Sequence, residues 1–363
     1  MKVAMVVEQL RRSNPGGIGT YARELTRAIV ASGTDVELVA SQCSVKIDPL
    51  GVLGPVSATR VAHRLTSRLW DRDLLKLDAS IAGRVDVEHA TSFHYPSPTS
   101  KGSPSLTVFV HDVAWRAHPD HFSARGVRFH EAALARSKRL ADHLLVPSRR
   151  TADALLADGI ASSKITVVPE GCDHLPTPEF TEPSDPYLLT VSTIEPRKNL
   201  PLLVRAYTDA IGRLSTGATK PRLVIVGAKG WDGRSGALPS SMPERVQMLG
   251  SVSDQTLSDL LAGAMGFLYV PLLEGFGLPP LEAMRAGVPT VASSTVPSVT
   301  EVSGESPCLL VDPTNLRSVS DAVEQLITNE DMRVEYRSRG LAFAGTRLWC
   351  ATADAHLAVW STL

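Results

Sequence analysis

The sequence predicts an α/β protein of two doubly wound, Rossmann-like domains, because short apolar strands alternate with amphipathic helices along its whole length. Such alternation gives parallel sheets that are covered by helices on both faces. The 363 residues exceed one ordinary core and suit two domains of about 150–180 residues each. A proline-rich stretch at mid-chain, residues 175–186, is typical of a linker.

The expected strands are short runs of β-branched and other apolar residues. In the first half they are Val3–Val7, Val36–Ala40, Val85–Glu88, Leu106–Val110, His143–Val146 and Ile165–Val168. In the second half they are Tyr187–Val191, Leu223–Val226, Val246–Leu249, Gly266–Val270, Thr290–Ala292 and Cys308–Val311. Amphipathic helices are expected over Gly19–Ala31, Leu200–Ile211 and Ser318–Thr328. We expect domains at residues 1–178 and 179–346, followed by a C-terminal helix at 347–363.

Composition narrows the class of protein. A net charge of −1 gives no global attraction to nucleic acid. The four cysteines are scattered, which argues against a disulfide framework or a zinc site and indicates a cytoplasmic protein. No apolar run reaches the roughly 18–20 residues of a membrane span.

Residues 60–77 combine basic side chains with leucines at helical spacing and predict an amphipathic helix. A surface helix is the favoured interpretation, and peripheral contact with a membrane is the alternative. The triplet Asp71-Arg72-Asp73 interrupts this pattern, and we do not expect it to bind a metal.

The run from Glu274 to Glu282 is the most informative motif, with seven residues between the two glutamates. It follows the expected strand Gly266–Val270, and the glycines Gly275 and Gly277 permit a tight turn. Two prolines then suit the first turn of a helix. Free N–H groups at a helix start attract anions, and carboxylates accept hydrogen bonds from hydroxyls. The run therefore predicts a site for a phosphorylated, hydroxyl-rich ligand such as a nucleotide sugar, although its spacing alone equally suits two solvated glutamates.

Other polar segments also follow expected strands, where ligands bind in doubly wound sheets. Gly16 and Gly17 lie before the first helix, and His111 follows Leu106–Val110. Arg197 and Lys198 precede the helix at Leu200, where cations oppose the helix dipole and predict an anionic partner. The segments 226–230 and 249–254 are turns that either line a nucleotide site or only connect elements.

Together these segments resemble the retaining glycosyltransferases of family 4, which have the GT-B fold. The run from Glu274 to Glu282 is similar to the Glu-(seven residues)-Glu signature of that family, and the resemblance covers nearly the whole chain. It implies that the C-terminal helix crosses back to the first domain. Many members carry a further arginine where this chain has Ser192, so the division of work between Arg197 and Lys198 stays open.

The resemblance implies two sets of site residues. The catalytic set is His111, Glu274, Arg197 and Lys198. The donor-binding set is Gly16, Gly17, Gly227, Val252, Gly275, Phe276, Gly277, Leu278 and Glu282. In this scheme Glu274 holds sugar hydroxyls, Glu282 holds the ribose, and the cations stabilise the leaving diphosphate without a metal or another cofactor.

The implied function is transfer of a sugar, with retention, from a nucleoside-diphosphate donor to a glycan or lipid-linked acceptor in cell-envelope polysaccharide synthesis. The form Glu195-Pro196-Arg197-Lys198-Asn199 resembles mannosyl- and rhamnosyltransferases and weakly favours GDP-mannose. Acceptor-binding loops are expected at residues 46–57 and 92–103, and the expected location is the cytoplasm, at the inner face of the membrane. The alternatives are a nucleotide-sugar epimerase and a non-catalytic nucleotide-sugar-binding protein. A nicotinamide dehydrogenase is disfavoured because no Gly-x-Gly-x-x-Gly fingerprint is present.

Overall fold

The computed structural model describes residues 1–42, 53, 56–99, 104–179, 185–228 and 242–363. The chain forms two compact units. Unit 1 is Met1–Gly171 together with Trp349–Leu363, and unit 2 is Cys172–Leu348. Much of the expected acceptor loops, part of the proline-rich stretch, and Lys229 and Gly230 of the expected 226–230 turn lie outside the described residues.

Unit 1 is built on a parallel sheet with the strand order β3-β2-β1-β4-β5-β6-β7. The strands are β1 (Lys2–Val6), β2 (Asp35–Gln42), β3 (Val56–Ala62), β4 (Val87–Ala90), β5 (Ser105–Phe109), β6 (His143–Val146) and β7 (Ile165–Val167). The helices are α1 (Gly16–Ala31), α2 (His63–Trp70), α3 (Ala79–Ala82), α4 (Ala114–Ala117), α5 (Ala124–Leu140), α6 (Arg149–Ala157) and α13 (Trp349–Trp360). Short 3-10 turns are η1 (Glu8–Arg11), η3 (Pro119–His121) and η4 (Ser162–Lys164).

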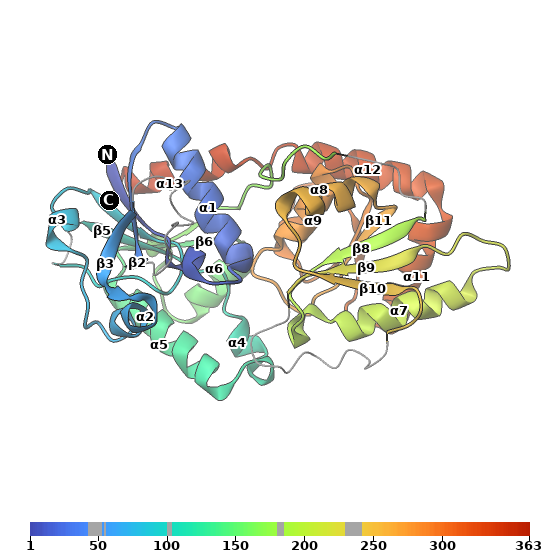
Figure 1. The fold of residues 1–363 in the computed structure, drawn as a ribbon, viewed down its shortest axis with the longest axis horizontal. Coiled ribbons are helices and arrows are strands. Elements are labelled where there is room, and N and C mark those ends of the chain that lie inside the picture. The colour runs from blue at the N-terminus through green and yellow to red at the C-terminus, as the bar shows by residue number, and fades with distance from the viewer. Residues whose placement is uncertain (43–52, 54–55, 100–103, 180–184, 229–241) are drawn as a thin grey trace. The chain divides into compact units, whose positions relative to one another are not determined.

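The first strand lies in the interior of this sheet. Val3 pairs with Val36 of β2 on one side and with Val87 of β4 on the other. Its residues from Val3 to Val6 are buried, as expected for a strand covered on both faces. Helix α13 packs beside α1 although it comes from the far end of the sequence (Figure 1).

Unit 2 repeats the architecture with the strand order β10-β9-β8-β11-β12-β13. Its strands are β8 (Tyr187–Val191), β9 (Arg222–Val226), β10 (Val246–Gly250), β11 (Gly266–Tyr269), β12 (Thr290–Ser293) and β13 (Leu309–Val311). Its helices are α7 (Leu200–Arg213), α8 (Asp254–Gly263), α9 (Leu278–Arg285), α10 (Pro297–Thr300), α11 (Leu316–Thr328) and α12 (Glu330–Ala344), with the 3-10 turn η5 (Pro196–Lys198).

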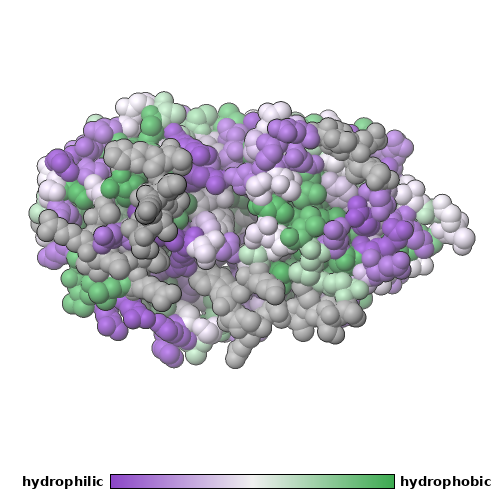
Figure 2. Space-filling model, viewed as in Figure 1, coloured by the Kyte–Doolittle hydropathy of each residue, from purple (hydrophilic) through white to green (hydrophobic). Residues whose placement is uncertain are grey.

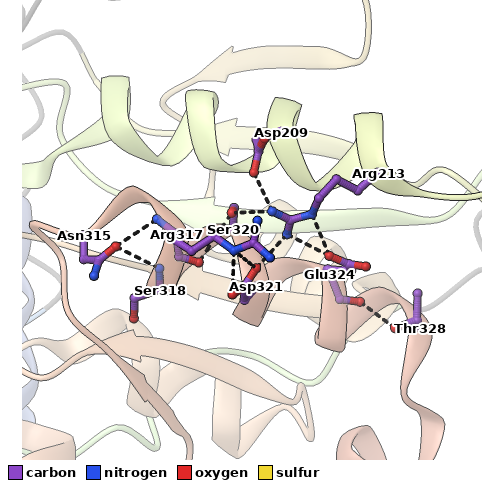
Figure 3. A network of polar contacts seen from close by, with 9 residues as sticks. All are labelled: Asp209, Arg213, Asn315, Arg317, Ser318, Ser320, Asp321, Glu324 and Thr328. Atoms are coloured by element: carbon purple, nitrogen blue, oxygen red, sulfur yellow. Dashed lines mark hydrogen bonds and ion pairs between the residues drawn. The ribbon is translucent and has the colours of Figure 1, made fainter.

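Helices α7 and α11 pack together on one face of this sheet, and α9 and α12 pack together as a second pair (Figure 1). Alternate strand residues such as Leu223 and Ile225 enter the core with α7 and α11. The rim of the α7–α11 contact carries a polar network in which Arg213 bridges Asp209, Asp321 and Glu324 (Figure 3). On the face shown in Figure 2, hydrophobic residues of unit 2 lie among hydrophilic ones.

The predicted fold class is confirmed, and each predicted strand coincides with an observed one to within a few residues. The prediction of one helix over residues 60–77 is wrong. Its first residues belong to β3, and α2 ends at Trp70. Asp73 then adopts a left-handed backbone with φ 58°, which a continuing helix cannot accommodate.

Candidate functional site

The candidate site in unit 2 lies where the strand order of its sheet reverses. Strands β8 and β11 are neighbours there, and ligands bind at the carboxyl ends of strands flanking such a point. The segments that follow the two strands are tied together. The Leu272 N–H donates to the Arg197 carbonyl at 2.8 Å, and the Asn199 side chain donates to the Val270 carbonyl at 3.1 Å.

Three of the four predicted catalytic residues meet at this point. Lys198 Nζ lies 2.5 Å from Glu274 Oε1, and Arg197 Nη1 lies 3.3 Å from Glu274 Oε2. Tyr269 at the end of β11 donates its hydroxyl to Glu274 Oε1 at 2.8 Å. Glu195 pairs with Arg197 at 2.8 Å. The predicted anionic partner of the two cations is therefore supplied, in this structure, by the chain itself.

The charges of this cluster are mutually stabilised. Burial raises the pKa of Glu274, but the charges of Lys198 and Arg197 and the hydrogen bonds from Lys198 and Tyr269 outweigh it, so the pKa lies below its ordinary value. Burial and the neighbouring carboxylate hold the pKa of Tyr269 well above its ordinary value. Glu274 is thus an ionised acceptor and Tyr269 a neutral donor.

The loop after Glu274 is fixed by its backbone. Gly277 has φ 100°, and a Cβ there would lie 2.5 Å from Val296 Cγ1, so a side chain is excluded. Ser298 holds the loop through hydrogen bonds to the Phe276 and Gly277 carbonyls. Helix α9 begins at Leu278 with prolines in its first turn, as predicted. Because prolines lack N–H groups, this helix start offers fewer free donors than the sequence argument assumed.

Other predicted donor-binding residues surround the same sheet edge. Gly227 follows β9, and a Cβ there would lie 1.8 Å from the Ser192 carbonyl oxygen, so the close approach of the two backbones requires glycine. Val252 lies half-buried between β10 and α8. Gly275, Phe276 and Leu278 are buried.

Glu282 is the one acidic site residue that does not join the cluster around Lys198. It lies on α9, and its Oε1 is 3.2 Å from Nε2 of His174. The side chains are 9% and 3% exposed. Sequence reasoning missed both His174 and Tyr269: the tyrosine looked like an ordinary strand residue, and no spacing pattern marks the histidine.

In unit 1, Gly16 and Gly17 form the first turn of α1 rather than a loop before it, which corrects the predicted helix start at Gly19. His111 follows β5 and contacts the Thr91 carbonyl through Nε2 at 2.9 Å. Its Nδ1 lies 3.6 Å from the buried carboxylate of Glu170. Because a carbonyl only accepts, Nε2 carries the proton and Nδ1 faces the carboxylate.

The ring of Tyr21 stands edge-on to His111, with centroids 5.0 Å apart, and belongs to a buried hydrogen-bond chain. His356 Nδ1 contacts the Thr352 carbonyl at 2.7 Å, so its Nε2 accepts from the Tyr21 hydroxyl at 2.9 Å. The Tyr21 oxygen then accepts from His89 Nε2 at 3.0 Å. Burial lowers the pKa of His356 to about 4, so the imidazole of His356 is neutral in this hydrogen-bond chain.

The chain continues through Thr107. Its hydroxyl lies 2.9 Å from His89 Nδ1 and accepts from Trp360 Nε1 at 3.1 Å. The Glu88 carbonyl could also accept the proton of the Thr107 hydroxyl, but it lies farther from the Thr107 oxygen, at 3.5 Å. Every proton in this chain thus has one favoured position, and α13 is joined to the sheet of unit 1 through polar groups.

The described residues hold one group that could bind a metal ion and no helix that could span a membrane. Asp73 pairs with Arg136 and Arg139, so the Asp71–Asp73 triplet serves a structural ion-pair network. Among the described residues, one group has suitable ligand atoms within 4.8 Å of one another, namely His118, Asp120 and His121 in unit 1. Of the helices in the described part of the chain, none is long and apolar enough to span a membrane.

Two family models match the chain, one in each half. Residues 15–174 match "Glycosyltransferase Family 4" and residues 174–342 match "Glycosyl transferases group 1". The O-antigen chain mannosyltransferase B of Escherichia coli is 30% identical, over 97% of this chain and 98% of that protein. The chain belongs to the glycosyltransferase family that these two models describe, group 1 and family 4. It is a glycosyltransferase with the GT-B fold, and both predictions are confirmed.

Further comparisons agree with this assignment. The D-inositol 3-phosphate glycosyltransferase of Kineococcus radiotolerans is 29% identical, over 95% of this glycosyltransferase and 90% of that protein. The crystal structure of HepE from Anabaena, in complex with UDP and glucose, superposes with a TM-score of 0.70 at 17% identity, covering all of both chains. At that identity the likeness concerns the fold.

Proposed function

We propose that this glycosyltransferase moves a hexose, preferentially mannose from GDP-mannose, to a hydroxyl of a glycan or lipid-linked acceptor in cell-envelope polysaccharide synthesis. The observation that carries the proposal is the cluster of Arg197, Lys198 and Glu274 at the sheet reversal. The mannosyltransferase from Escherichia coli, similar over nearly its whole length, supports the sugar and the pathway class. The family assignment favours transfer over epimerisation or simple binding.

In the proposed reaction the bond between the anomeric carbon and the diphosphate oxygen breaks. The acceptor oxygen bonds to the same face of the sugar, and its proton passes to the leaving diphosphate, so the configuration is retained. Arg197 and Lys198 stabilise the charge on the diphosphate, and no divalent metal is required. As the diphosphate draws these cations away, Glu274 becomes free to accept hydrogen bonds from sugar hydroxyls.

A peripheral membrane contact fits the exposed residues that follow β3. Leu65 is 52% exposed and Leu74 is 66% exposed, although both are large and apolar. Arg68, Arg72 and Lys76 are exposed around them. Leucines and cations on one surface suit an anionic lipid interface, which would keep the enzyme at the cytoplasmic face beside a lipid-linked acceptor.

The test of the site is the pair of variants Lys198→Ala and Glu274→Ala, assayed for GDP-mannose hydrolysis and for transfer. Loss of one charge-stabilising group of this kind lowers kcat by about 10²–10³-fold. Lys164→Ala, an exposed lysine of unit 1, serves as the matched control and should keep wild-type turnover. Wild-type turnover in both site variants would show that this cluster does not carry out the reaction.

A further inference from the structure

His174 and Glu282 form a nearly buried pair in unit 2, away from any hydrogen bond to the Lys198 cluster. Nε2 of His174 lies 3.2 Å from Oε1 of Glu282. Among the described residues, His174 is the only side chain in ion-pair or hydrogen-bond contact with this carboxylate. A buried carboxylate is costly unless it receives hydrogen bonds, so the imidazole supplies what the carboxylate needs.

The backbone around His174 is anchored to unit 2 on both sides. Before it, the Cys172 N–H donates to the Arg347 carbonyl at 2.9 Å. After it, the Ser258 hydroxyl donates to the Pro176 carbonyl at 2.6 Å. Glu282 also has a fixed backbone, since it lies on helix α9 and Ser298 holds the loop that leads into that helix. Two rigid supports therefore set the plane of the carboxylate.

The chemistry of the two groups determines which of them donates the hydrogen bond. A carboxylate only accepts hydrogen bonds, so Nε2 of His174 carries the proton that points at Oε1. This contact occupies one carboxylate oxygen and leaves Oε2 as the acceptor for another group. A cis-diol such as that of a ribose presents hydroxyl donors to an oxygen in that position.

We propose that His174 is a positioning residue of the donor site, which orients Glu282 toward the ribose hydroxyls of the nucleotide. The inference rests on the role proposed for Glu282 as the ribose-binding carboxylate. It adds a specificity function to the segment at the start of unit 2. His174 acts through Glu282 and contacts neither the sugar nor the diphosphate.

The experiment compares GDP with 2′,3′-dideoxy-GDP by calorimetry, so that the readout is discrimination for the ribose hydroxyls. His174→Phe keeps an aromatic ring and removes the donor, whereas His174→Gln keeps an N–H near the position of Nε2. We expect the preference of the wild-type enzyme for GDP, about tenfold or more for charged hydrogen bonds, to fall several-fold in His174→Phe and to be largely kept in His174→Gln. A purely packing role would make the two substitutions alike.

Two controls separate the possible failures. His143→Phe, at a half-buried histidine of β6 that bonds Thr166, should leave the discrimination unchanged. If Glu282→Ala abolishes the preference while His174→Phe retains it, the inference about His174 is overturned and the proposed donor site stands. If Glu282→Ala leaves the preference intact, or the wild type shows none, the role of Glu282 fails, and the role of His174 fails with it.

Discussion

Glu274 shows how a carboxylate stays ionised inside a protein core. Its burial alone would neutralise it, and the two cations and one phenol around it reverse that effect. Arg197, Lys198 and Glu274 were predictable because each follows a strand whose carboxyl end reaches the same sheet edge. His174 was not predictable, because its role depends on a contact across about 110 residues of sequence, which no local spacing reveals. Tyr269 lies only five residues before Glu274, but it ends an apolar run and looks like an ordinary strand residue.

For Glu88 on β4 the effect of burial on the pKa outweighs that of the neighbouring charge, unlike for Glu274. It is fully buried, and neither carboxylate oxygen has a hydrogen-bond partner among the described residues. Burial raises its pKa to about 8, opposed only by the charge of Arg136. Between its ordinary pKa and pH 8, the unfolded chain loses this proton and the folded chain keeps it. The free energy of unfolding therefore decreases as pH rises through that window, by up to roughly 1.4 kcal/mol per pH unit.

We expect Glu88→Gln to remove this slope. The variant should be more stable than the wild type at pH 7 and should lose that advantage at pH 4, where the wild-type carboxyl is protonated in both states. Urea unfolding between pH 4 and pH 8, followed by tryptophan fluorescence, measures the difference. It reports mainly on unit 1, which contains Trp70, Trp115, Trp349 and Trp360. A difference that stays constant with pH would show that Glu88 is ionised in the folded state.

At the scale of elements, the sheets were predictable and the segment after β2 was not. Residues 56–77 contain cations and apolar residues that fit helical spacing, yet the chain uses them for β3, for α2 and for a turn at Asp73. Short apolar patterns suit both strand and helix, so periodicity alone could not place this boundary. The turn is decided by a distant contact, the ion pairs of Asp73 with α5.

A prediction at the scale of elements concerns the hydrogen-bond chain that joins helix α13 to the rest of unit 1. Tyr21→Phe keeps the aromatic packing and removes the hydroxyl that joins His89 to His356. Each ring nitrogen left without a partner costs about 1–3 kcal/mol, so we expect a loss of stability of that order in unit 1. Tyr336→Phe, in unit 2, is the matched control and should stay within about 0.5 kcal/mol of wild type. Chemical denaturation measures both, and equal effects of the two substitutions would argue against the buried chain.

For the whole molecule, we predict that turnover is independent of divalent metal. The diphosphate charge is assigned to Arg197 and Lys198, so dialysis against EDTA should leave transfer unchanged. The assay is initial rate before and after chelation, with Mg²⁺ and Mn²⁺ added back separately. A loss on chelation that either ion restores would mean that the cation pair does not suffice.

Unit 1 is assembled from two stretches of chain that enclose the whole of unit 2 in sequence. Residues 349–363 emerge from the ribosome only after every residue of unit 2 has been made. Independent domains usually fold in the order of their synthesis, but unit 1 cannot be completed first, because His89 and Tyr21 wait for His356. The earlier half of the enzyme is therefore finished only after its last helix has been made.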